Sequence, residues 1–256
     1  SDVATITVDI SAVNDSPVAG NDMVGASEDT AVTFDVRAND SDPEGNALSV
    51  VQINGTAIAS GGSVVVSNGT VTRLASGSLR FNPSANFNGN TSFAYTVSDG
   101  NGGTDVATVN LTIAATNDAP SAVNDAATTN EDQQVNLNLL ANDSDVDGDT
   151  LQITHIAGTA VAVGNTVVVP NGTATLLADG TVNFNPSPNF NGTLSFGYMV
   201  SDGAASSSAV ADVVVNPVND APTANDDDGF TADGTTPLTI LAADLLANDS
   251  DVDGDV

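Results

Sequence analysis

An internal repeat of about one hundred residues constrains the fold of this chain more than any other feature. Asn-Asp-Ser-Pro at residues 14–17 returns as Asn-Asp-Ala-Pro at residues 117–120 and again at 219–222, with spacings of 103 and 102 residues. This period is far longer than that of solenoid repeats, whose units run from about 20 to 50 residues. Each repeat is therefore long enough to form a domain with its own core.

Further matches between the repeats fix their boundaries. Phe-Asn-Pro-Ser, Asn-Phe-Asn-Gly and Tyr-x-Val-Ser-Asp-Gly occur in the same order after each of the first two linkers. The predicted organisation has the last strand of a preceding repeat, two whole repeats, and the start of a further, truncated repeat. These four parts cover residues 1–16, 17–118, 119–220 and 221–256.

Each repeat is predicted to consist of β-strands. Apolar and polar residues alternate at 32–36, 92–97 and 108–113, as in half-buried strands. Asn-Gly and Asp-Gly pairs separate such segments and suit tight turns with positive φ. About seven short strands in a hundred residues are typical of an immunoglobulin-like Greek-key β-sandwich. The predicted fold class is all-β, with tandem sandwiches joined by short acidic linkers.

For the second repeat the sequence predicts strand A after Pro120 and F–G strands near its end. The predicted segments are B at 134–140, C at 151–156, D and E within 166–184, F at 193–200 and G at 209–215. Because successive antiparallel strands alternate in direction, the N-terminal linker, the B–C loop and the F–G loop lie at one end. The A–B turn and the C-terminal linker lie at the other.

The composition is strongly acidic. The chain has 33 Asp and Glu against 3 Lys and Arg, for a formal charge of -30. Such a surface cannot displace the counterions of phosphate, so we exclude nucleic acid as a partner and expect no binding to anionic membranes. No apolar run is long enough to span a bilayer, so we expect no membrane insertion in this part of the protein. There is no cysteine.

Much of the acid is concentrated in one loop of each repeat. Asn-Asp-Ser-Asp-Val-Asp-Gly-Asp occupies 142–149 and 248–255, and a looser copy, Asn-Asp-Ser-Asp-Pro-Glu-Gly, occupies 39–45. Neighbouring carboxylates repel one another unless they bind protons or a cation. The candidate metal ligands in these loops are Asp40, Asp42 and Glu44; Asp143, Asp145, Asp147 and Asp149; and Asp249, Asp251, Asp253 and Asp255.

The predicted strand directions bring further acidic residues to the same junctions between repeats. The linkers contribute Asn14 and Asp15, Asn117 and Asp118, and Asn219 and Asp220; the A–B turns contribute Glu28 and Asp29, and Glu131 and Asp132; the F–G loops contribute Asp99 and Asp202. Calcium takes six to eight oxygen ligands in flexible geometry, whereas magnesium prefers a smaller shell and keeps its waters. We therefore predict calcium sites between consecutive repeats.

Two simpler interpretations remain open for parts of this set. Asp, Asn, Ser and Gly favour turns, and acidic loops are often only solvated. For Asp22, Asp125 and Asp226, which follow each linker, ligand and surface charge are equally good interpretations.

The loop also matches the first half of an EF-hand loop, with Gly148 at the sixth position, but the twelfth position is Thr154 and no flanking helices are expected, which excludes a true EF-hand.

The linkers, the acidic loop, Asn-Phe-Asn-Gly and Tyr-x-Val-Ser-Asp-Gly together resemble the cadherin-like tandem repeats of large bacterial surface proteins, including RTX-type adhesins. The resemblance covers essentially the whole chain and implies an extracellular rod with calcium at its junctions. By this resemblance, the upstream acidic ligand is Glu28 or Glu131, the linker ligands are Asn117-Asp118 or Asn219-Asp220, and the next repeat supplies Asp143 and Asp145 or Asp249 and Asp251. The first repeat departs from the pattern at 42–44 and the third at 232–235.

The expected function is a calcium-stiffened extender of a bacterial cell-surface adhesin, whose immediate partners are the neighbouring repeats. No enzymatic activity is expected, because His155 is the only histidine and no cysteine or second histidine is present to complete a triad or a zinc site. Two alternatives are calcium-dependent carbohydrate binding, for which Phe87, Phe190 and Phe230 are the candidate platforms, and self-association of repeats. Cell-surface glycans or a second copy would then be the partners, and the expected location is secreted or cell-surface.

Overall fold

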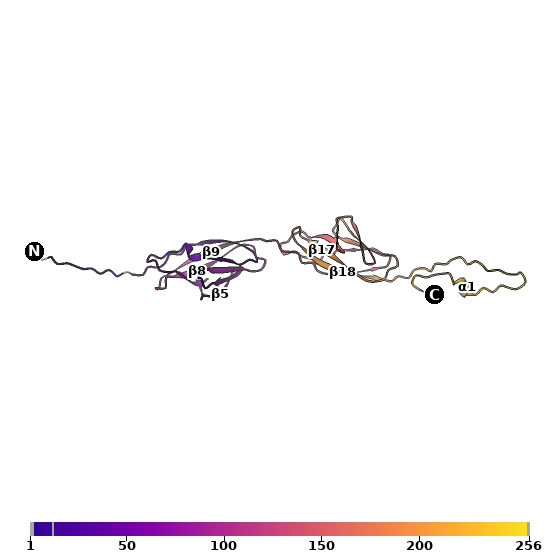
Figure 1. Ribbon diagram of the computed structural model, residues 1–256, viewed down its shortest axis with the longest axis horizontal. Helices are drawn as coiled ribbons and strands as arrows, with labels where there is room; N and C mark the ends of the chain where they lie inside the picture. Colours follow the sequence, from indigo (N-terminus) through magenta and orange to yellow (C-terminus); the bar gives the residue numbers. More distant parts are fainter. Residues whose placement is uncertain (1–2, 12, 255–256) are drawn as a thin grey trace. The chain divides into compact units, whose positions relative to one another are not determined.

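The computed structural model describes residues 3–11 and 13–254. The chain divides into two compact units, Ser1–Thr116 and Asn117–Val256. Each unit contains one sandwich of two β-sheets, and the labelled strands of both are visible in Figure 1. The prediction of an all-β chain with tandem Ig-like sandwiches is confirmed, apart from two very short helices.

The first sandwich is built from nine strands and one 3₁₀ turn within the described residues. They are β1 (Asp22–Ser27), β2 (Val32–Phe34), η1 (Val36–Ala38), β3 (Ser49–Ile53), β4 (Thr56–Ala57), β5 (Ser63–Val66), β6 (Gly69–Arg73), β7 (Leu79–Pro83), β8 (Gly89–Ser98) and β9 (Thr104–Ala114). The strands form one sheet in the order β1-β9-β8-β3-β4 and a second in the order β2-β7-β6-β5.

The second sandwich repeats this topology. Its strands are β10 (Asp125–Asn130), β11 (Val135–Leu137), β12 (Gln152–Ile156), β13 (Thr159–Ala160), β14 (Thr166–Val169), β15 (Gly172–Leu176), β16 (Val182–Pro186), β17 (Gly192–Ser201) and β18 (Ser206–Asn216). The two sheets have the orders β10-β18-β17-β12-β13 and β11-β16-β15-β14. The long β17–β18 pair and its counterpart β8–β9 form the centres of the larger sheets.

Alternating residues of both sheets fill the core between them. In β7 the side chains of Leu79, Phe81 and Pro83 are buried while those between them are exposed, as expected for a strand with one solvated face. The Phe81 ring stacks on Phe93 with 6.4 Å between centroids, and Phe184 stacks on Phe196 at 6.2 Å. All four phenylalanines are buried in the cores of the two units.

The first strand of each sandwich runs parallel to the last. Asp22 to Ser27 of β1 pair with Val109 to Ala114 of β9, and β10 pairs with β18 in the same register. Every other strand pair is antiparallel among the described strands. Because the chain begins β10 and ends β18 in the same direction, it comes in at one end of the sandwich and leaves at the other.

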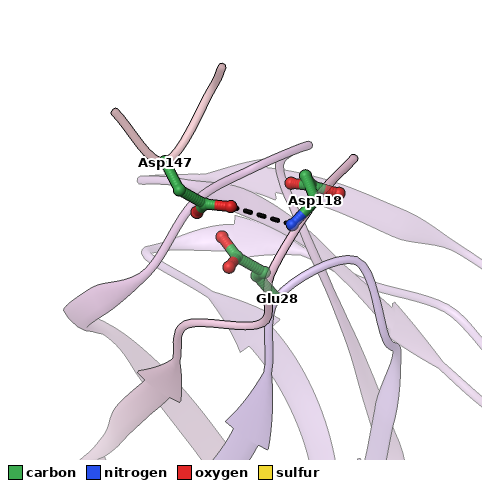
Figure 2. A group of neighbouring side chains, drawn as sticks. All are labelled: Glu28, Asp118 and Asp147. Carbon is green, nitrogen blue, oxygen red and sulfur yellow. Dashed lines mark hydrogen bonds between the residues drawn. The ribbon is translucent and has the colours of Figure 1, made fainter. Parts of the chain in front are cut away.

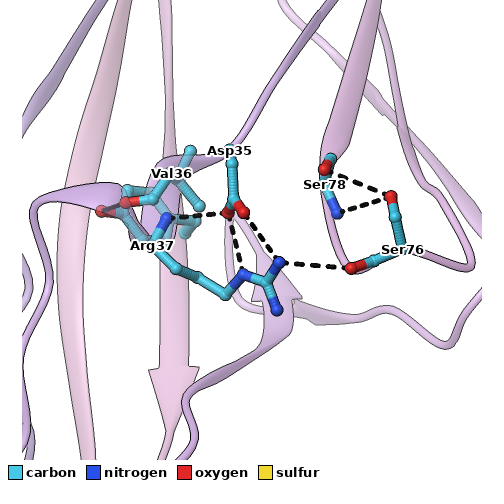
Figure 3. A network of polar contacts seen from close by, with 6 residues as sticks. Asp35, Val36, Arg37, Ser76 and Ser78 are labelled. Atoms are coloured by element: carbon cyan, nitrogen blue, oxygen red, sulfur yellow. Dashed lines mark hydrogen bonds and ion pairs between the residues drawn. The ribbon is translucent and has the colours of Figure 1, made fainter.

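The B strand of the first unit ends in a short polar network (Figure 3). The Asp35 carboxylate caps η1 by accepting from the backbone N–H of Arg37 and pairs with the Arg37 guanidinium at 2.8 Å. Arg37 also donates to the carbonyl oxygen of Ser76 at 3.2 Å. The Arg37 hydrogen bond holds the pKa of Asp35 below its usual value. The positive charge of Arg37 is thus paired within this network.

The strands differ from the predicted set in two places. The region predicted as D and E, 166–184, holds two hairpins formed by β14, β15 and β16, and a two-residue strand β13 folds back on β12. Strand B is shorter than predicted, because the chain turns after Leu137. Asn-Gly and Gly-rich turns are close enough together here to reverse the chain twice, which the alternation pattern alone does not reveal.

The predicted terminal strand in residues 1–16 is not formed among residues 3–11, whose apolar side chains, such as Ile6 and Ile10, are exposed. A lone strand has no hydrogen-bonding neighbour and no opposing sheet, so alternation is not sufficient to order it. The predicted start of a third repeat contains α1 (Ala242–Leu245) and a single bridge from Thr223 to Ser250. No helix in the described ranges is long and apolar enough to cross a membrane.

Candidate metal centre

The acidic loop of the second unit folds around Asp145. One carboxylate oxygen of Asp145 accepts from the backbone N–H groups of Asp147 and Asp149, at 2.9 and 3.3 Å. Gly148 has φ of 81°, a conformation that L residues rarely adopt, and allows the bend. Asp145, Asp147 and Asp149 each place one carboxylate oxygen within 4.8 Å of an oxygen of the other two. The other oxygen of Asp145, Oδ2, is buried without a hydrogen-bond partner, and a buried carboxylate oxygen without a donor is unfavourable unless a cation is near.

Each linker is fastened to the acidic loop that follows it. The N–H of Asp118 donates to Asp147 Oδ2 at 2.8 Å, as Figure 2 shows. The same bond joins Asp15 to Glu44 at 3.2 Å and Asp220 to Asp253 at 2.6 Å. A short distance further along the chain, an isolated antiparallel β-bridge also joins linker and loop in each repeat. The three bridges pair Val18 with Ser41, Ser121 with Ser144, and Thr223 with Ser250. Linker and loop therefore form one structural motif in all three places where the sequence repeats.

The F–G loop joins this motif through the linker asparagine. Asn117 Nδ2 donates to Asp202 Oδ2 at 2.9 Å, and Asn14 donates to Asp99 Oδ2 at 2.7 Å. The other oxygen of Asp202 accepts from the N–H groups of Ala204 and Ala205. The backbone bond from Ala205 and then the Asn117 amide hold the pKa of Asp202 below its usual value, and for Asp99 the Asn14 amide is the largest cause.

At the opposite end of each sandwich, the A–B turn presents a buried glutamate. Glu131 is 3% exposed; its Oε1 accepts from the N–H of Val218 and its Oε2 from Asn191 Nδ2. Asp132 has φ of 57° and accepts from the N–H of Asn189. In the first unit Glu28 is 2% exposed and accepts from the Thr116 N–H and from Asn88.

This turn explains a motif whose role the sequence analysis missed. Asn-Phe-Asn-Gly supplies a backbone N–H to the aspartate and a side-chain amide to the glutamate of the turn, in both units. Its phenylalanines, Phe87 and Phe190, pack against the cores. The signal for this role was the recurrence of the motif in register with the Glu-Asp turn.

Carboxylates from three segments meet around Asp220 in the second unit. Burial raises the pKa of Asp220 most, followed by the charges of Asp253, Asp132, Glu131 and Asp251. Asp220 Oδ2 is buried and has no hydrogen-bond partner. The chain's three arginines all lie in the first unit, at positions 37, 73 and 80. The donor atoms gathered here are oxygens, which suits a hard cation such as calcium and not zinc or copper.

The first aspartate of each loop is placed differently from the others. Asp143 Oδ1 accepts from the Val123 N–H, Asp40 Oδ1 from the Gly20 N–H, and Asp249 Oδ1 from the Asn225 N–H, all at 2.8 Å. These bonds hold the start of the A segment against the loop. The clusters around Asp145 and Asp220 do not include these residues.

The hydroxyl group of the core tyrosine also contributes to the polar contacts at the start of the A segment. Tyr198 lies 2.7 Å from Asp125 Oδ2 and 2.8 Å from the carbonyl oxygen of Val123. Burial, and then the charge of Asp143, raises the pKa of Asp125, although the bond from Tyr198 opposes the shift. In the first unit Tyr95 donates to Asp40 Oδ1 at 3.0 Å instead, and burial raises the pKa of Asp22. Asp125 is thus bonded to the core tyrosine, a role that neither interpretation of the sequence included.

The first and third repeats depart from the sequence pattern at 42–44 and 232–235, but they keep most of the bonds that join the linker to the acidic loop. Asp42 Oδ1 accepts from the N–H groups of Glu44 and Asn46, and its Oδ2 is buried without a partner, so Asp42 matches Asp145 despite Pro43. Asp251 likewise accepts from the Asp253 N–H. In the third repeat Asp233 accepts from Thr235 and Thr236 where a Glu-Asp turn would stand. Asp255 lies outside the described residues.

The sequence matches the bacterial Ig domain family over residues 14–112 and again over 117–216. The chain belongs to this family. The two matched segments of these bacterial Ig domains correspond to the two sandwiches. No curated protein matches the chain.

Several solved structures resemble these bacterial Ig domains at low identity. An endo-fucoidan hydrolase of glycoside hydrolase family 107, MfFcnA4, is 22% identical with a TM-score of 0.30, covering 79% of this chain and 29% of that one. Mouse clustered protocadherin PcdhgC3 EC1-3 is 14% identical with a TM-score of 0.40, at 80% and 68% coverage. Human mucin-like protocadherin EC1-2 is 14% identical with a TM-score of 0.41, at 79% and 98%. The chain thus spans less than a third of the hydrolase.

Proposed function

We propose that these bacterial Ig domains form a calcium-binding extender of a bacterial cell-surface adhesin, stiffened by calcium at the junctions between consecutive repeats. The observation that carries this proposal is the environment of Asp220. Its Oδ2 is buried without a hydrogen-bond partner, and its pKa is raised by burial and then by the charges of four other carboxylates. A protein that gathers five carboxylates without a basic residue gains most from a divalent cation at that point.

The proposed ligands come from three segments. At the second junction Glu131 and Asp132 belong to the A–B turn, Asn219 and Asp220 to the linker, and Asp251 and Asp253 to the following loop. At the first junction the same register gives Glu28, Asp29, Asn117, Asp118, Asp145 and Asp147. Calcium would neutralise these carboxylates and remove the freedom of the linker between repeats.

The residues themselves prepare the site. The Asn191 amide and the Val218 N–H hold the Glu131 carboxylate, and Asp145 is held by two N–H groups through one oxygen while the other stays available. Bacterial Ig domains are usually extracellular, and extracellular modules bind calcium with dissociation constants of about 10⁻⁴–10⁻³ M. Calcium that binds only the folded state would stabilise it by mass action.

Calcium dependence tests the proposal directly. We expect calcium at about 1 mM to raise the melting temperature and lengthen the particle in small-angle scattering, with magnesium much less effective and a chelator reversing both changes. A melting temperature and scattering profile that ignore calcium would overturn the calcium assignment.

A variant pair then tests the residues. Asp145→Asn keeps the oxygen that accepts from Asp147 and Asp149 but removes the charge, so we expect the calcium-free fold to persist and the calcium-induced rise in melting temperature to shrink. Asp179→Asn, in the β15–β16 turn, serves as the control because Asp179 accepts locally from Thr181. Equal calcium responses in both variants would contradict the proposed ligand set.

A further inference from the structure

The two sheets of each sandwich differ sharply in charge. The strands of the smaller sheets, β2-β7-β6-β5 and β11-β16-β15-β14, contain no acidic residue. The larger sheets carry Asp22 and Asp105 in the first unit and Asp125 and Asp212 in the second. In the first unit the smaller sheet also holds Arg73 and Arg80. In a chain with a formal charge of -30, a second copy meets the least repulsion at these smaller sheets.

The outward side chains of the smaller sheet are uncharged and bonded to one another in the second unit. Thr166 Oγ1 lies 2.8 Å from Thr175 Oγ1, and Asn183 Nδ2 donates to Asn136 Oδ1 at 2.7 Å. The first unit repeats the first of these contacts between Ser63 and Thr72 at 2.8 Å. Such cross-strand pairs hold the surface of the sheet in one arrangement.

The outer edge of this sheet is a strand with one free side. Within the described residues β14 pairs only with β15, and β5 only with β6. Val168, in the middle of β14, is 80% exposed, and Val65 of β5 is 81% exposed. Neither strand contains a charged residue or a proline, two features that protect an edge from pairing with another chain.

The other edges of the two sandwiches are less suited to pairing. The edges β4 and β13 have two residues each, and β2 and β11 have three. The edges β1 and β10 are longer, but both begin with an aspartate. The acid-free edges of four residues, β5 and β14, are therefore the places where a strand of the same acidic chain can approach.

We propose that this edge is a self-association surface, at which β14 of one copy pairs antiparallel with β14 of a second copy about a two-fold axis and extends the four-stranded sheet to eight. The backbone N–H and C=O groups of the free side supply the hydrogen bonds, and Val168 of each copy covers the other across the new pair. β5 offers an equivalent edge in the first unit. Each chain therefore carries two such edges, one in each unit.

Sedimentation equilibrium of the whole chain over a concentration series, in chelator and again in calcium, tests this surface. We expect concentration-dependent dimers that strengthen as sodium chloride screens the net charge. Val168→Lys should weaken association at least tenfold, and Val65→Lys with Val168→Lys should leave monomers. The added lysines make the chain less acidic, so a loss of dimer cannot come from a larger net charge on the two copies.

Val106→Lys is the matched control, because Val106 is also an exposed valine, at 59%, but belongs to β9 of the other sheet. It should associate like the unmodified chain. Since the chain has no cysteine, Val168→Cys provides a second readout: mild oxidation should give a disulfide-linked dimer much faster than for Val106→Cys. A chain that stays monomeric at every concentration, or equal effects of the Val168 and Val106 variants, would overturn the proposal.

Discussion

Ala157 occupies a backbone conformation that disfavours alanine. Its φ is 47°, and the equivalent Asn54 of the first unit has φ of 46°. Left-handed φ values are unfavourable for residues with a Cβ atom, and asparagine tolerates them better because its side chain bonds locally. Asn54 does so here, since its Oδ1 accepts from the Ala94 N–H at 2.7 Å.

We therefore predict that Ala157→Asn stabilises the second unit by about 0.5–1 kcal/mol. The new amide oxygen can accept from the N–H of Gly197, which lies at the Ala94 position. Hydrogen exchange of second-unit amides measures the change without interference from the first unit. Asn54→Ala should do the reverse, and a stabilising effect of that reverse variant would contradict the explanation.

Arg73 is a second residue for which the equivalent residue in the other unit predicts a stabilising substitution. It stands where the second unit has the buried Leu176, and its Nε is buried without a hydrogen-bond partner. An unsatisfied buried donor costs about 1–3 kcal/mol. Arg73→Leu should raise the free energy of unfolding of the first unit by roughly 1 kcal/mol, measured by urea denaturation. Arg80→Leu, at an exposed position, should change it little, and similar gains in both variants would indicate a general charge effect.

The pKa values of individual carboxyl groups should also differ. Burial and Asp143 raise the pKa of Asp125, so its protonation favours the folded state and that contribution is lost as pH rises through its folded pKa. The N–H groups and Asn117 lower the pKa of Asp202, so its contribution is lost as pH falls. Carbon-detected NMR of the metal-free protein should show Asp125 titrating above and Asp202 below ordinary aspartates. The reverse order would show that these bonds are absent in solution.

At the scale of elements, the pairing of β15 with β16 depends on a closely packed glycine, Gly172. A Cβ atom on Gly172 would lie 2.5 Å from the carbonyl oxygen of Asn185 and 2.8 Å from the Phe184 ring. Gly69 meets Asn82 and Phe81 in the same way. These glycines leave room for the phenylalanine ring of the neighbouring strand in the same sheet, β16 or β7.

Gly172→Ala should therefore destabilise the second unit by roughly 1–3 kcal/mol through overpacking. The control is Gly197→Ala in β17, where the nearest atom would be 3.8 Å away, and its effect should stay within about 0.5 kcal/mol. Thermal unfolding followed by calorimetry compares the two. Equal effects would mean that β-propensity, and not the close approach, decides the choice of glycine.

The elements also show what the sequence could and could not predict. The period of 103 residues and the alternation at 92–97 located the sandwiches, the core aromatics and the loop around Asp145, because each depends on local pattern. The bonds from Asn191 to Glu131 and from Tyr198 to Asp125 could not be predicted, since they join residues 60 and 73 positions apart. Which side chains meet across a sandwich depends on the register of strand pairs, and that register is a property of the folded sheets.

The whole molecule carries a charge of -30, which opposes compaction unless it is screened or neutralised. We predict that sodium chloride raises the melting temperature of the metal-free chain, because salt screens repulsion among exposed carboxylates within about 10 Å at 0.1 M. In saturating calcium the same addition should have a smaller effect, since fewer charges remain to be screened. A melting temperature that does not respond to salt without calcium would show that repulsion contributes little to stability.

The parallel pairing of first and last strands has a mechanical consequence. β10 and β18 pair over six residues, Asp125 to Asn130 against Ala211 to Asn216, and the chain comes in through one strand and leaves through the other. A pull on the two ends of the sandwich acts along both strands in opposite directions, so it loads the hydrogen bonds between them in shear. Bonds in shear must break together, whereas those of a hairpin pulled from its open end break one at a time. Each sandwich is therefore arranged to resist tension along the chain.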